Sequence, residues 1–161
     1  MKRSSEISKI VLDTSVLVEY IVENAPYRDI VVDLFNRAKE KKVDLIVNSV
    51  TLGETLYIAS RIYEHAGIPD PNTEAFNYIL WVKGLVRIVE NDYEVAITAG
   101  ELKKELHLSL ADCYVIATGK IMNAVSLFRT IEKEMRGVLN KLRKLNVLFL
   151  SEDFAPKVET E

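Results

Sequence analysis

The fold of this chain is indicated first by residues 9–17, which read KIVLDTSVL. The run before Asp13 is short, apolar and rich in β-branched residues, which is typical of a parallel strand buried on both faces. After Asp13 the apolar residues Val16, Leu17 and Tyr20 recur with the spacing of one helix face. The stretch therefore predicts a buried strand that leads directly into a helix, with a carboxylate at the junction.

The same alternation of strand and helix continues along the rest of the chain. Further apolar runs that predict strands lie at residues 45–47, 85–89, 124–127 and 147–150. Segments with helical period lie at residues 16–21, 30–38, 52–62, 75–80, 95–106, 111–118 and 131–145. The last of these contains a break at Gly137, and residues 67–72, which hold Pro69 and Pro71, are expected to form a loop.

Strands that alternate with helices in this way pair in parallel and are joined by crossover connections. The expected fold class is α/β, a three-layer helix–sheet–helix sandwich around a mainly parallel sheet of roughly five strands. A length of 161 residues with 48% apolar and 28% charged residues predicts one domain over residues 1–161. Its ordered core is expected at about residues 8–151, with loose ends at residues 1–6 and 152–161.

Composition argues against several classes of protein. No apolar run approaches the roughly 18 residues of a membrane span, and residues 1–8 lack the apolar centre of a signal peptide. The single cysteine, Cys113, cannot form an intrachain disulfide and fits a reducing cytoplasm. With only His65 and His107 besides, a His/Cys zinc site is not expected. The net charge of −3 means that nucleic-acid binding would need a local basic face.

Acidic residues stand where chemistry is expected in such a fold. Asp13 directly follows the first strand, Glu54 lies in the first turn of the helix after the second strand, and Asp112 lies in the first turn of the helix over residues 111–118. Ligands of parallel α/β sheets gather at the carboxyl ends of the strands. Asp13 and Glu54 are therefore expected at the same end of the sheet, joined by Asp112 if its helix begins there.

Each acid taken alone has a simpler interpretation as a helix cap. Asp13 is placed to be an N-cap residue. Thr51 and Glu54 have the spacing of a capping box, and Ser109 with Asp112 forms a shorter version of the same pattern. Both interpretations stay open for each acid, because a carboxylate has two oxygens and can cap a helix and bind a ligand together.

The three acids considered together favour a metal site. Carboxylates gathered at one edge of a sheet repel one another and raise each other's pKa. A hard divalent cation such as Mg²⁺ or Mn²⁺ removes this cost, because it accepts oxygen ligands and can also take a substrate phosphate. The pattern therefore predicts a divalent-metal site formed by Asp13, Glu54 and Asp112.

Three segments resemble, in order, the motifs of PIN-domain nucleases, and most of all those of VapC-type toxin ribonucleases. They are residues 10–20 (IVLDTSVLVEY), 50–56 (VTLGETL) and 108–118 (LSLADCYVIAT). The resemblance implies a single PIN-like domain with the activity of a Mg²⁺- or Mn²⁺-dependent endoribonuclease. It also implies that Asp13, Glu54 and Asp112 bind the metal and act in catalysis, with Ser15 or Thr14 supporting Asp13.

The resemblance further implies a fourth acid after the fourth strand, commonly an Asp in a Thr-x-Asp context. Here residues 127–134 read LFRTIEKE, and gapless spacing from the preceding motif reaches Thr130. The nearest acid requires a shift of two positions, to Glu132. Glu132 is the predicted fourth metal-binding and catalytic acid, with Glu134 in reserve. The alternative is that both side chains simply face solvent beside basic neighbours.

Other residues bear on substrate and partners. Arg129, just after the fourth strand, is the best candidate for a contact with an RNA phosphate. The chain also has many large apolar side chains, namely Tyr20, Tyr27, Phe35, Tyr57, Ile58, Tyr63, Phe76, Tyr78 and Trp81. Some of them are expected to form a homodimer surface or a groove for an antitoxin helix, and core packing is the equal alternative. Both interfaces are implied by the resemblance.

Three other functions compete with a toxin ribonuclease. One is a PIN-like module that binds RNA or protein without catalysis, and another is an RNA-processing nuclease outside any toxin–antitoxin pair. The third is a phosphoryl-transfer protein with Asp at the end of its first strand. The dehalogenase type of such proteins needs a second Asp where this chain has Ser15, and the acidic pair and late lysine of the receiver type are absent.

Overall fold

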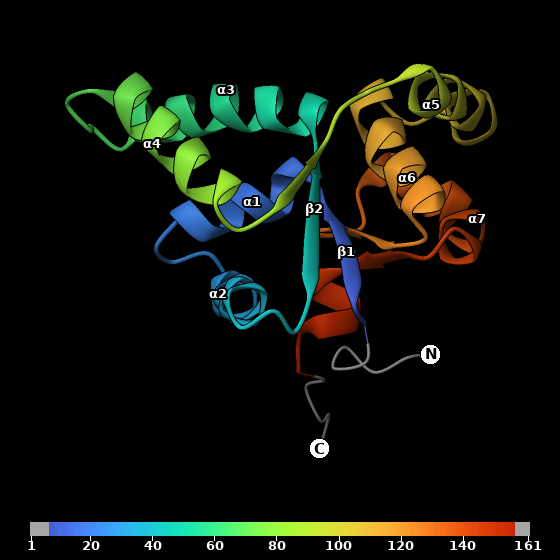
Figure 1. The fold of residues 1–161 in the computed structure, drawn as a ribbon, viewed down its shortest axis with the longest axis horizontal. Coiled ribbons are helices and arrows are strands. Elements are labelled where there is room, and N and C mark those ends of the chain that lie inside the picture. Colours follow the sequence, from blue (N-terminus) through green and yellow to red (C-terminus); the bar gives the residue numbers. More distant parts are fainter. Residues whose placement is uncertain (1–6, 157–161) are drawn as a thin grey trace.

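A five-stranded parallel sheet forms the centre of the protein (Figure 1). The structure is a computed structural model, and it describes residues 7–156. The strands are β1 (Lys9–Leu12), β2 (Asp44–Asn48), β3 (Arg87–Val89), β4 (Val125–Phe128) and β5 (Val147–Phe149). Their order in the sheet is β3-β2-β1-β4-β5, and each neighbouring pair is parallel. The predicted α/β fold class with a parallel sheet is therefore confirmed.

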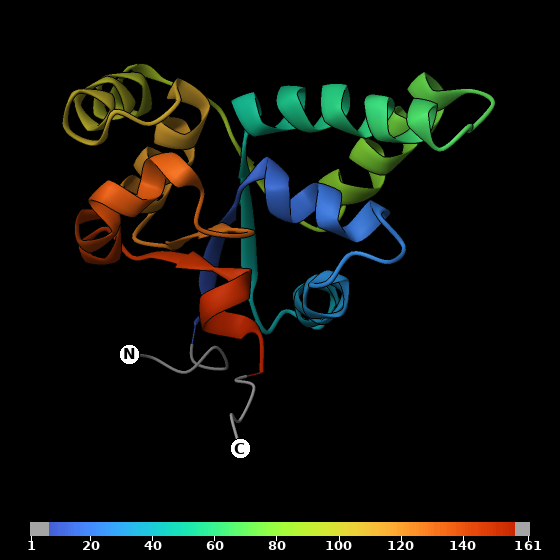
Figure 2. The same ribbon diagram turned by 180° about the vertical axis from the view of Figure 1, so that it is seen from behind.

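Helices cover both faces of this sheet. They are α1 (Thr14–Ile21), α2 (Arg28–Lys39), α3 (Ser49–His65), α4 (Pro71–Lys83), α5 (Tyr93–Leu106), α6 (Leu110–Met122) and α7 (Leu139–Lys144). A 3₁₀ helix, η2 (Lys133–Val138), precedes α7, and a short π-helical turn, η3 (Leu150–Phe154), follows β5. Figures 1 and 2 show α1–α4 on one side of the sheet and α5–α7 on the other, which is the expected three-layer sandwich.

Alternation along β1 divides the core in two. Ile10 and Leu12 belong to the apolar cluster beneath α1–α4, whereas Val11 belongs to the cluster beneath α5–α7. Successive side chains of a strand point to opposite faces, so an apolar strand contributes to both layers. None of the helices within residues 7–156 is long and apolar enough to cross a membrane.

Two element boundaries in the middle of the chain differ from the prediction. The third strand was expected over residues 85–89 but begins at Arg87, because the N–H groups of Leu85 and Val86 donate to the Val82 carbonyl in the turn after α4. The expected loop over residues 67–72 ends early, because Pro71 starts α4. Proline suits the first helical position, and the Asp70 side chain caps the helix.

The C-terminal part departs further from the prediction. The helix expected over residues 131–145 is divided into the 3₁₀ helix η2 and α7, since Gly137 weakens the helix interior and Val138 leaves the helical conformation. The loose end expected from residue 152 is wrong up to Phe154, because η3 is held by Asp153. The Asp153 carboxylate is 4% exposed and accepts hydrogen bonds from Arg143 at 2.7 Å and from the Phe149 N–H at 2.8 Å. The expected loose residues 1–6 and 157–161 lie outside the described part.

The large apolar side chains are shared between core and surface. Tyr20, Phe35, Tyr78 and Trp81 pack against one another with ring centroids 4.9–6.1 Å apart. Two others lie at the surface, with Tyr57 of α3 64% and Phe76 of α4 57% exposed, and Leu80 of α4, which was not in the predicted set, is 62% exposed. Core packing therefore accounts for part of the set, and the interfaces expected from the rest stay predictions.

Candidate functional site

The first acid lies where β1 ends. Asp13 continues the ladder, because its backbone N–H donates to the Leu127 carbonyl at 3.0 Å. Its side chain is the N-cap of α1, as predicted, and one carboxylate oxygen, Oδ2, accepts from the Ser15 N–H at 3.0 Å and the Ser15 hydroxyl at 2.6 Å. The residue is only 6% exposed. The strand–helix junction therefore holds this carboxylate in one orientation.

The second acid is not a capping residue. Helix α3 begins at Ser49, and its N-cap is Asn48, whose side chain accepts from the Val50 N–H at 2.8 Å. Thr51 consequently lies inside the helix and is buried, so the capping box predicted for Thr51 and Glu54 is wrong. Glu54 lies in the second turn of α3 and not in the first turn as predicted, and there no free helix N–H needs its carboxylate.

The third acid lies in the first turn of α6. Ser109 is the N-cap of this helix, and its hydroxyl accepts from the Asp112 N–H at 3.1 Å. The capping interpretation is therefore correct for Ser109. The Asp112 side chain is partly buried, and helix α6 brings it to the same edge of the sheet as Asp13.

All of the predicted acids meet in one cleft of about 550 Å³. The residues that line it are Asp13, Thr14, Ser15, Val18, Glu54, Ile58, Ser109, Asp112, Glu132 and Glu134. Both candidates for the fourth position, Glu132 and Glu134, are thus present, one before η2 and the other in its first turn. We call this the acidic cleft. It brings together carboxylates that are up to 121 positions apart in the sequence (134 minus 13).

The pKa values of two of these acids show how costly the negative charges are in the cleft. The pKa of Asp13 is raised to about 6, chiefly by burial and to a smaller extent by the charge of Glu54. The Ser15 hydrogen bonds act in the opposite direction. The pKa of Asp112 rises to about 7, chiefly through burial and then through the charge of Asp13. Glu132 and Glu54 add smaller repulsions. A cation in the cleft would favour the ionised form of both carboxyls and so offset the effects of burial and of their mutual repulsion.

The donor set of the acidic cleft fits a hard divalent cation. Its side-chain donors are carboxylate and hydroxyl oxygens, without a nitrogen or sulfur ligand. Within residues 7–156, no three His, Cys, Asp or Glu side chains converge closely enough to enclose a metal as they lie. Mg²⁺ ordinarily keeps several waters and takes only one or two carboxylates directly. An open acidic cleft of this kind suits a largely hydrated ion.

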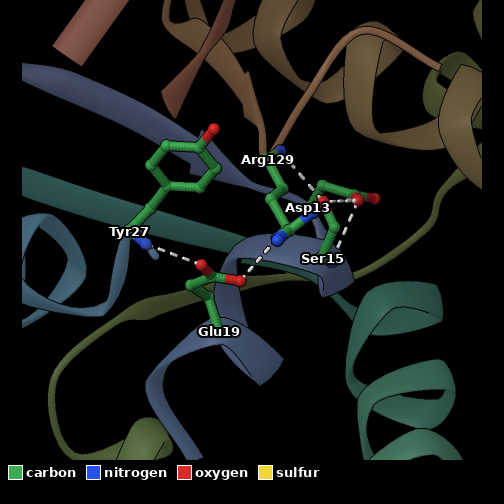
Figure 3. Close-up of polar contacts among 5 residues, drawn as sticks. All are labelled: Asp13, Ser15, Glu19, Tyr27 and Arg129. Atoms are coloured by element: carbon green, nitrogen blue, oxygen red, sulfur yellow. Dashed lines mark hydrogen bonds and ion pairs between the residues drawn. The ribbon is translucent and has the colours of Figure 1, made fainter. Parts of the chain in front are cut away.

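A hydrogen-bond network behind the cleft supports Asp13 (Figure 3). The Arg129 backbone N–H donates to the Ser15 hydroxyl oxygen at 3.1 Å, so the single hydroxyl proton of Ser15 is directed to Asp13. Both Ser15 donors contact Oδ2, and the Thr14 N–H also interacts with the Asp13 carboxylate. Thr14 supports Asp13 through its backbone N–H and not through its hydroxyl, which donates to the Thr51 carbonyl at 3.5 Å.

The side chain of Arg129 belongs to the same network. Its Nε donates to Glu19 Oε2 at 2.6 Å, and Glu19 is only 4% exposed. The other Glu19 oxygen accepts from the Tyr27 N–H at 2.8 Å, and the Arg129 guanidinium lies 5.4 Å from the centroid of the Tyr27 ring. Arg129 is therefore anchored beside the acidic cleft rather than lining it. Its predicted contact with an RNA phosphate stays a prediction.

Sequence analysis missed two supporting residues, Glu19 and Asn48. Nothing in the order of residues brings Glu19 to Arg129, because the contact spans 110 positions. Asn48 is fully buried, and its amide donates to the Thr118 hydroxyl at 2.8 Å, which ties the start of α3 to α6. A signal for Asn48 was available, since it ends an apolar strand before a helix, as Asp13 does. These contacts fix the helices that carry Glu54 and Asp112.

The sequence is similar to one described family. The sequence model of the PIN domain matches residues 10–144, which is most of the chain. No curated protein matches it in sequence.

Several solved structures of toxin–antitoxin proteins share the fold at low sequence identity. VapC20 from Mycobacterium tuberculosis, described as a toxin that cleaves the sarcin-ricin loop, is 14% identical, with a TM-score of 0.59 over 80% of this chain and 94% of that one. A chain of VapBC2 from Rickettsia felis, bound to promoter DNA, is 16% identical, with a TM-score of 0.64 over 88% of this chain and 98% of that one. A chain of DNA-bound VapBC from Salmonella typhimurium is 15% identical, with a TM-score of 0.64 over 89% and 98%.

Proposed function

Because this chain belongs to the PIN domain family, we propose that it is a metal-dependent endoribonuclease that hydrolyses RNA phosphodiester bonds at the acidic cleft. The observation that carries the proposal is the convergence of acids from separate segments at the carboxyl ends of parallel strands. The metal-binding and catalytic residues proposed are Asp13, Glu54, Asp112 and Glu132.

The proposed cofactor is Mg²⁺ or Mn²⁺, held by Asp13 and Asp112 directly or through water, with Glu54 and Glu132 nearby. The chemistry that such an ion supplies when bound is a lowered pKa for water and neutralisation of charge on the phosphate oxygens. Ser15 holds one oxygen of Asp13 through two hydrogen bonds, which orient the carboxylate. Burial of Asp13 excludes water from one side of the site and strengthens its interaction with a cation.

We further propose that the protein is the toxin of a VapBC-type toxin–antitoxin pair in the cytoplasm. The similar folds of VapC20 and of the VapBC complexes support this proposal. An antitoxin protein and a second copy of the chain are the proposed protein partners. The exposed Tyr57, Phe76 and Leu80 on α3 and α4 support such contacts, because large apolar side chains at a surface commonly mark interfaces.

The experiment that tests the ribonuclease is cleavage of a panel of structured RNAs by the full chain. We expect cleavage in Mn²⁺ or Mg²⁺, none in a chelator, and at least ~100-fold slower cleavage by Asp112→Asn, the loss typical of removing charge stabilisation at a reacting phosphate. Asp33→Asn, which removes an exposed acid of α2, is the matched control. Equal cleavage by Asp112→Asn and the wild type would contradict the proposal.

A second candidate function is an RNA- or protein-binding module without catalysis. It is favoured by the capping role of Asp13 and by the absence of a preformed three-ligand cluster within residues 7–156. Isothermal titration with Mn²⁺ separates the two functions. A nuclease must bind the ion at the cleft, and Asp13→Asn must weaken that binding, whereas a capping residue alone leaves the titration flat in both proteins. RNA cleavage outside a toxin–antitoxin pair is the remaining alternative.

A further inference from the structure

A second hollow lies next to the acidic cleft and is not used by the proposed reaction. It has a volume of about 370 Å³. Ile131 and Leu139 give it an apolar floor, and Tyr27, Thr130, Arg136 and Glu152 provide an aromatic ring, a hydroxyl and two opposite charges. We call it the Tyr27 pocket. Its combination of aromatic, apolar and basic groups differs sharply from the carboxylates next to it.

One short segment, residues 129–136, lies between the two hollows, and we call it the partition. Glu132 and Glu134 line the acidic cleft, whereas Thr130, Ile131 and Arg136 from the same segment line the Tyr27 pocket. Arg129, at the start of the segment, reaches toward both sides, since its N–H donates to Ser15 and its guanidinium lies 5.4 Å from the centroid of the Tyr27 ring. A polymer whose phosphodiester lies in the acidic cleft can therefore cross this partition and place an adjacent unit in the Tyr27 pocket.

The aromatic wall of the pocket is held in place before anything binds. The Tyr27 N–H donates to the buried Glu19 carboxylate, whose other oxygen holds Arg129. The Arg129 carbonyl in turn accepts from the Ser151 N–H at 3.1 Å, which ties the π-helical turn η3 to the partition. Because the Tyr27 backbone is held in this way and its ring lies near the Arg129 guanidinium, the ring loses less conformational entropy on binding, and more of the stacking energy remains as affinity.

The charges of the pocket suit a phosphate. Arg136 is exposed and forms no ion pair within residues 7–156. Arg129 pairs with Glu19 through Nε alone and remains 36% exposed, so its terminal nitrogens keep free donors. Guanidinium groups hold phosphates with two parallel hydrogen bonds. The partition therefore supplies the positive charge that the acidic cleft lacks.

We propose that the Tyr27 pocket binds a nucleotide next to the cleaved phosphodiester of single-stranded RNA, with its base against the Tyr27 ring and a phosphate on Arg136. Unpaired bases are recognised by stacking on aromatic rings and by hydrogen bonds to their edges. The inference rests on the proposed ribonuclease function and adds to it a specificity-determining subsite.

The polar rim of the pocket also indicates which bases fit. Glu152 presents a carboxylate, which accepts hydrogen bonds from the exocyclic amino groups of adenine, cytosine or guanine. Uracil has no amino group, and its one donor on that edge, N3–H, is flanked by two carbonyl oxygens that the carboxylate repels. We therefore expect amino-bearing bases to be preferred over uracil at this position.

The test uses the full chain in Mn²⁺ and single-stranded RNA oligonucleotides with one cleavage site, in which each flanking base is varied in turn. Wild type should discriminate against uracil at one fixed position. Tyr27→Leu should raise KM by about tenfold, the loss expected for one base stack, and Glu152→Gln should weaken the discrimination at that position alone. Tyr27→Phe keeps the ring and should behave as wild type.

Arginine variants test the phosphate contact. Arg136→Ala should raise KM several-fold and make binding less sensitive to salt, whereas Arg136→Lys should retain part of the affinity. Lys83→Ala removes the same charge from an exposed position on α4 and should change neither property. Thermal unfolding of each variant separates a local loss from a failure to fold.

The outcomes that overturn the inference are distinct from failure of the proposed function. If cleavage persists and Tyr27→Leu has the base preference and KM of wild type, the pocket is not a nucleotide subsite. Binding of the same oligonucleotides to the Asp112→Asn variant, compared with the Asp112→Asn, Tyr27→Leu double variant, tests the pocket in the absence of RNA cleavage. Absence of cleavage by wild type with Tyr27-dependent binding would reject the nuclease and retain the pocket. Tyr27-independent binding would reject the pocket.

Discussion

The two walls of the acidic cleft are built in opposite ways. On one wall Asp13 is 6% exposed, and both donors of Ser15 hold one of its oxygens. On the other wall Glu132 and Glu134 are exposed at the start of a 3₁₀ helix and form no side-chain hydrogen bond in the part of the chain that the structure describes. One wall is ordered before a ligand arrives, and the other must be ordered by it.

This difference has a cost on each side. Fixing Asp13 in a buried position raises its pKa to about 6, because burial disfavours the ionised form of the carboxyl. The exposed glutamates avoid that cost but lose side-chain entropy, on the order of 1 kcal/mol or more each, when they bind. The buried wall with Asp13 should therefore determine whether the site works, and the exposed wall with Glu132 and Glu134 should adjust how well it works.

The largest expected effect is that of Asp13→Asn. The amide oxygen can still cap α1, so the fold should persist, but the charge on the buried wall is lost. We expect kcat/KM for RNA cleavage to fall by at least ~100-fold. A fall of only a few-fold, with an unfolding curve like that of wild type, would show that the buried wall is not decisive.

The next effect concerns the support behind that wall. Glu19→Gln removes the carboxylate that holds Arg129 and leaves a guanidinium without its partner. We expect roughly tenfold weaker Mn²⁺ binding by titration calorimetry, because groups that orient a ligating side chain typically contribute 10–100-fold. A double-mutant cycle with Arg129→Gln measures the coupling of the two residues. Additive losses would contradict a shared network.

A smaller effect is expected on the exposed wall formed by Glu132 and Glu134. Glu132→Gln should lower kcat/KM by about fivefold, since an exposed and adaptable acid contributes less than a fixed one. Glu134→Gln should change it by less than about twofold if Glu132 is the fourth acid. A larger loss in Glu134→Gln would exchange their roles. If either loss equalled that of Asp13→Asn, the contrast between the walls would be wrong.

The smallest effect is a pH dependence of stability in the metal-free protein. The pKa values of Asp13 and Asp112 rise in the folded state from 3.8 to about 6 and about 7. Their contribution to stability is therefore present below pH ~4 and is lost as the pH rises through 6 to 7. Calorimetry from pH 4 to 8 should therefore show the melting temperature falling as the two carboxyls ionise. Asp112→Asn should reduce this slope, and Mn²⁺ should remove it.

Much of the sheet could be predicted from the sequence, and so could the position of Asp13. A buried parallel strand needs apolar residues on both faces, and an N-cap needs a short polar side chain at the strand–helix junction, so both leave local signals. The capping box at Glu54 failed because Asn48 begins the helix earlier. The helix over residues 131–145 failed because apolar spacing does not separate a 3₁₀ turn from an α-helix.

The alternation of strands and helices and the acids at the strand ends follow from local patterns, because both depend on residues close together in the chain. Only the tertiary structure brought Glu132 and Glu134 to the same cleft as Asp13, and only it joined Glu19 to Arg129 behind Ser15. The physical reason is that parallel pairing of β1 with β4 joins segments more than 100 positions apart. Contacts across such a distance depend on how the layers pack, which no local pattern records.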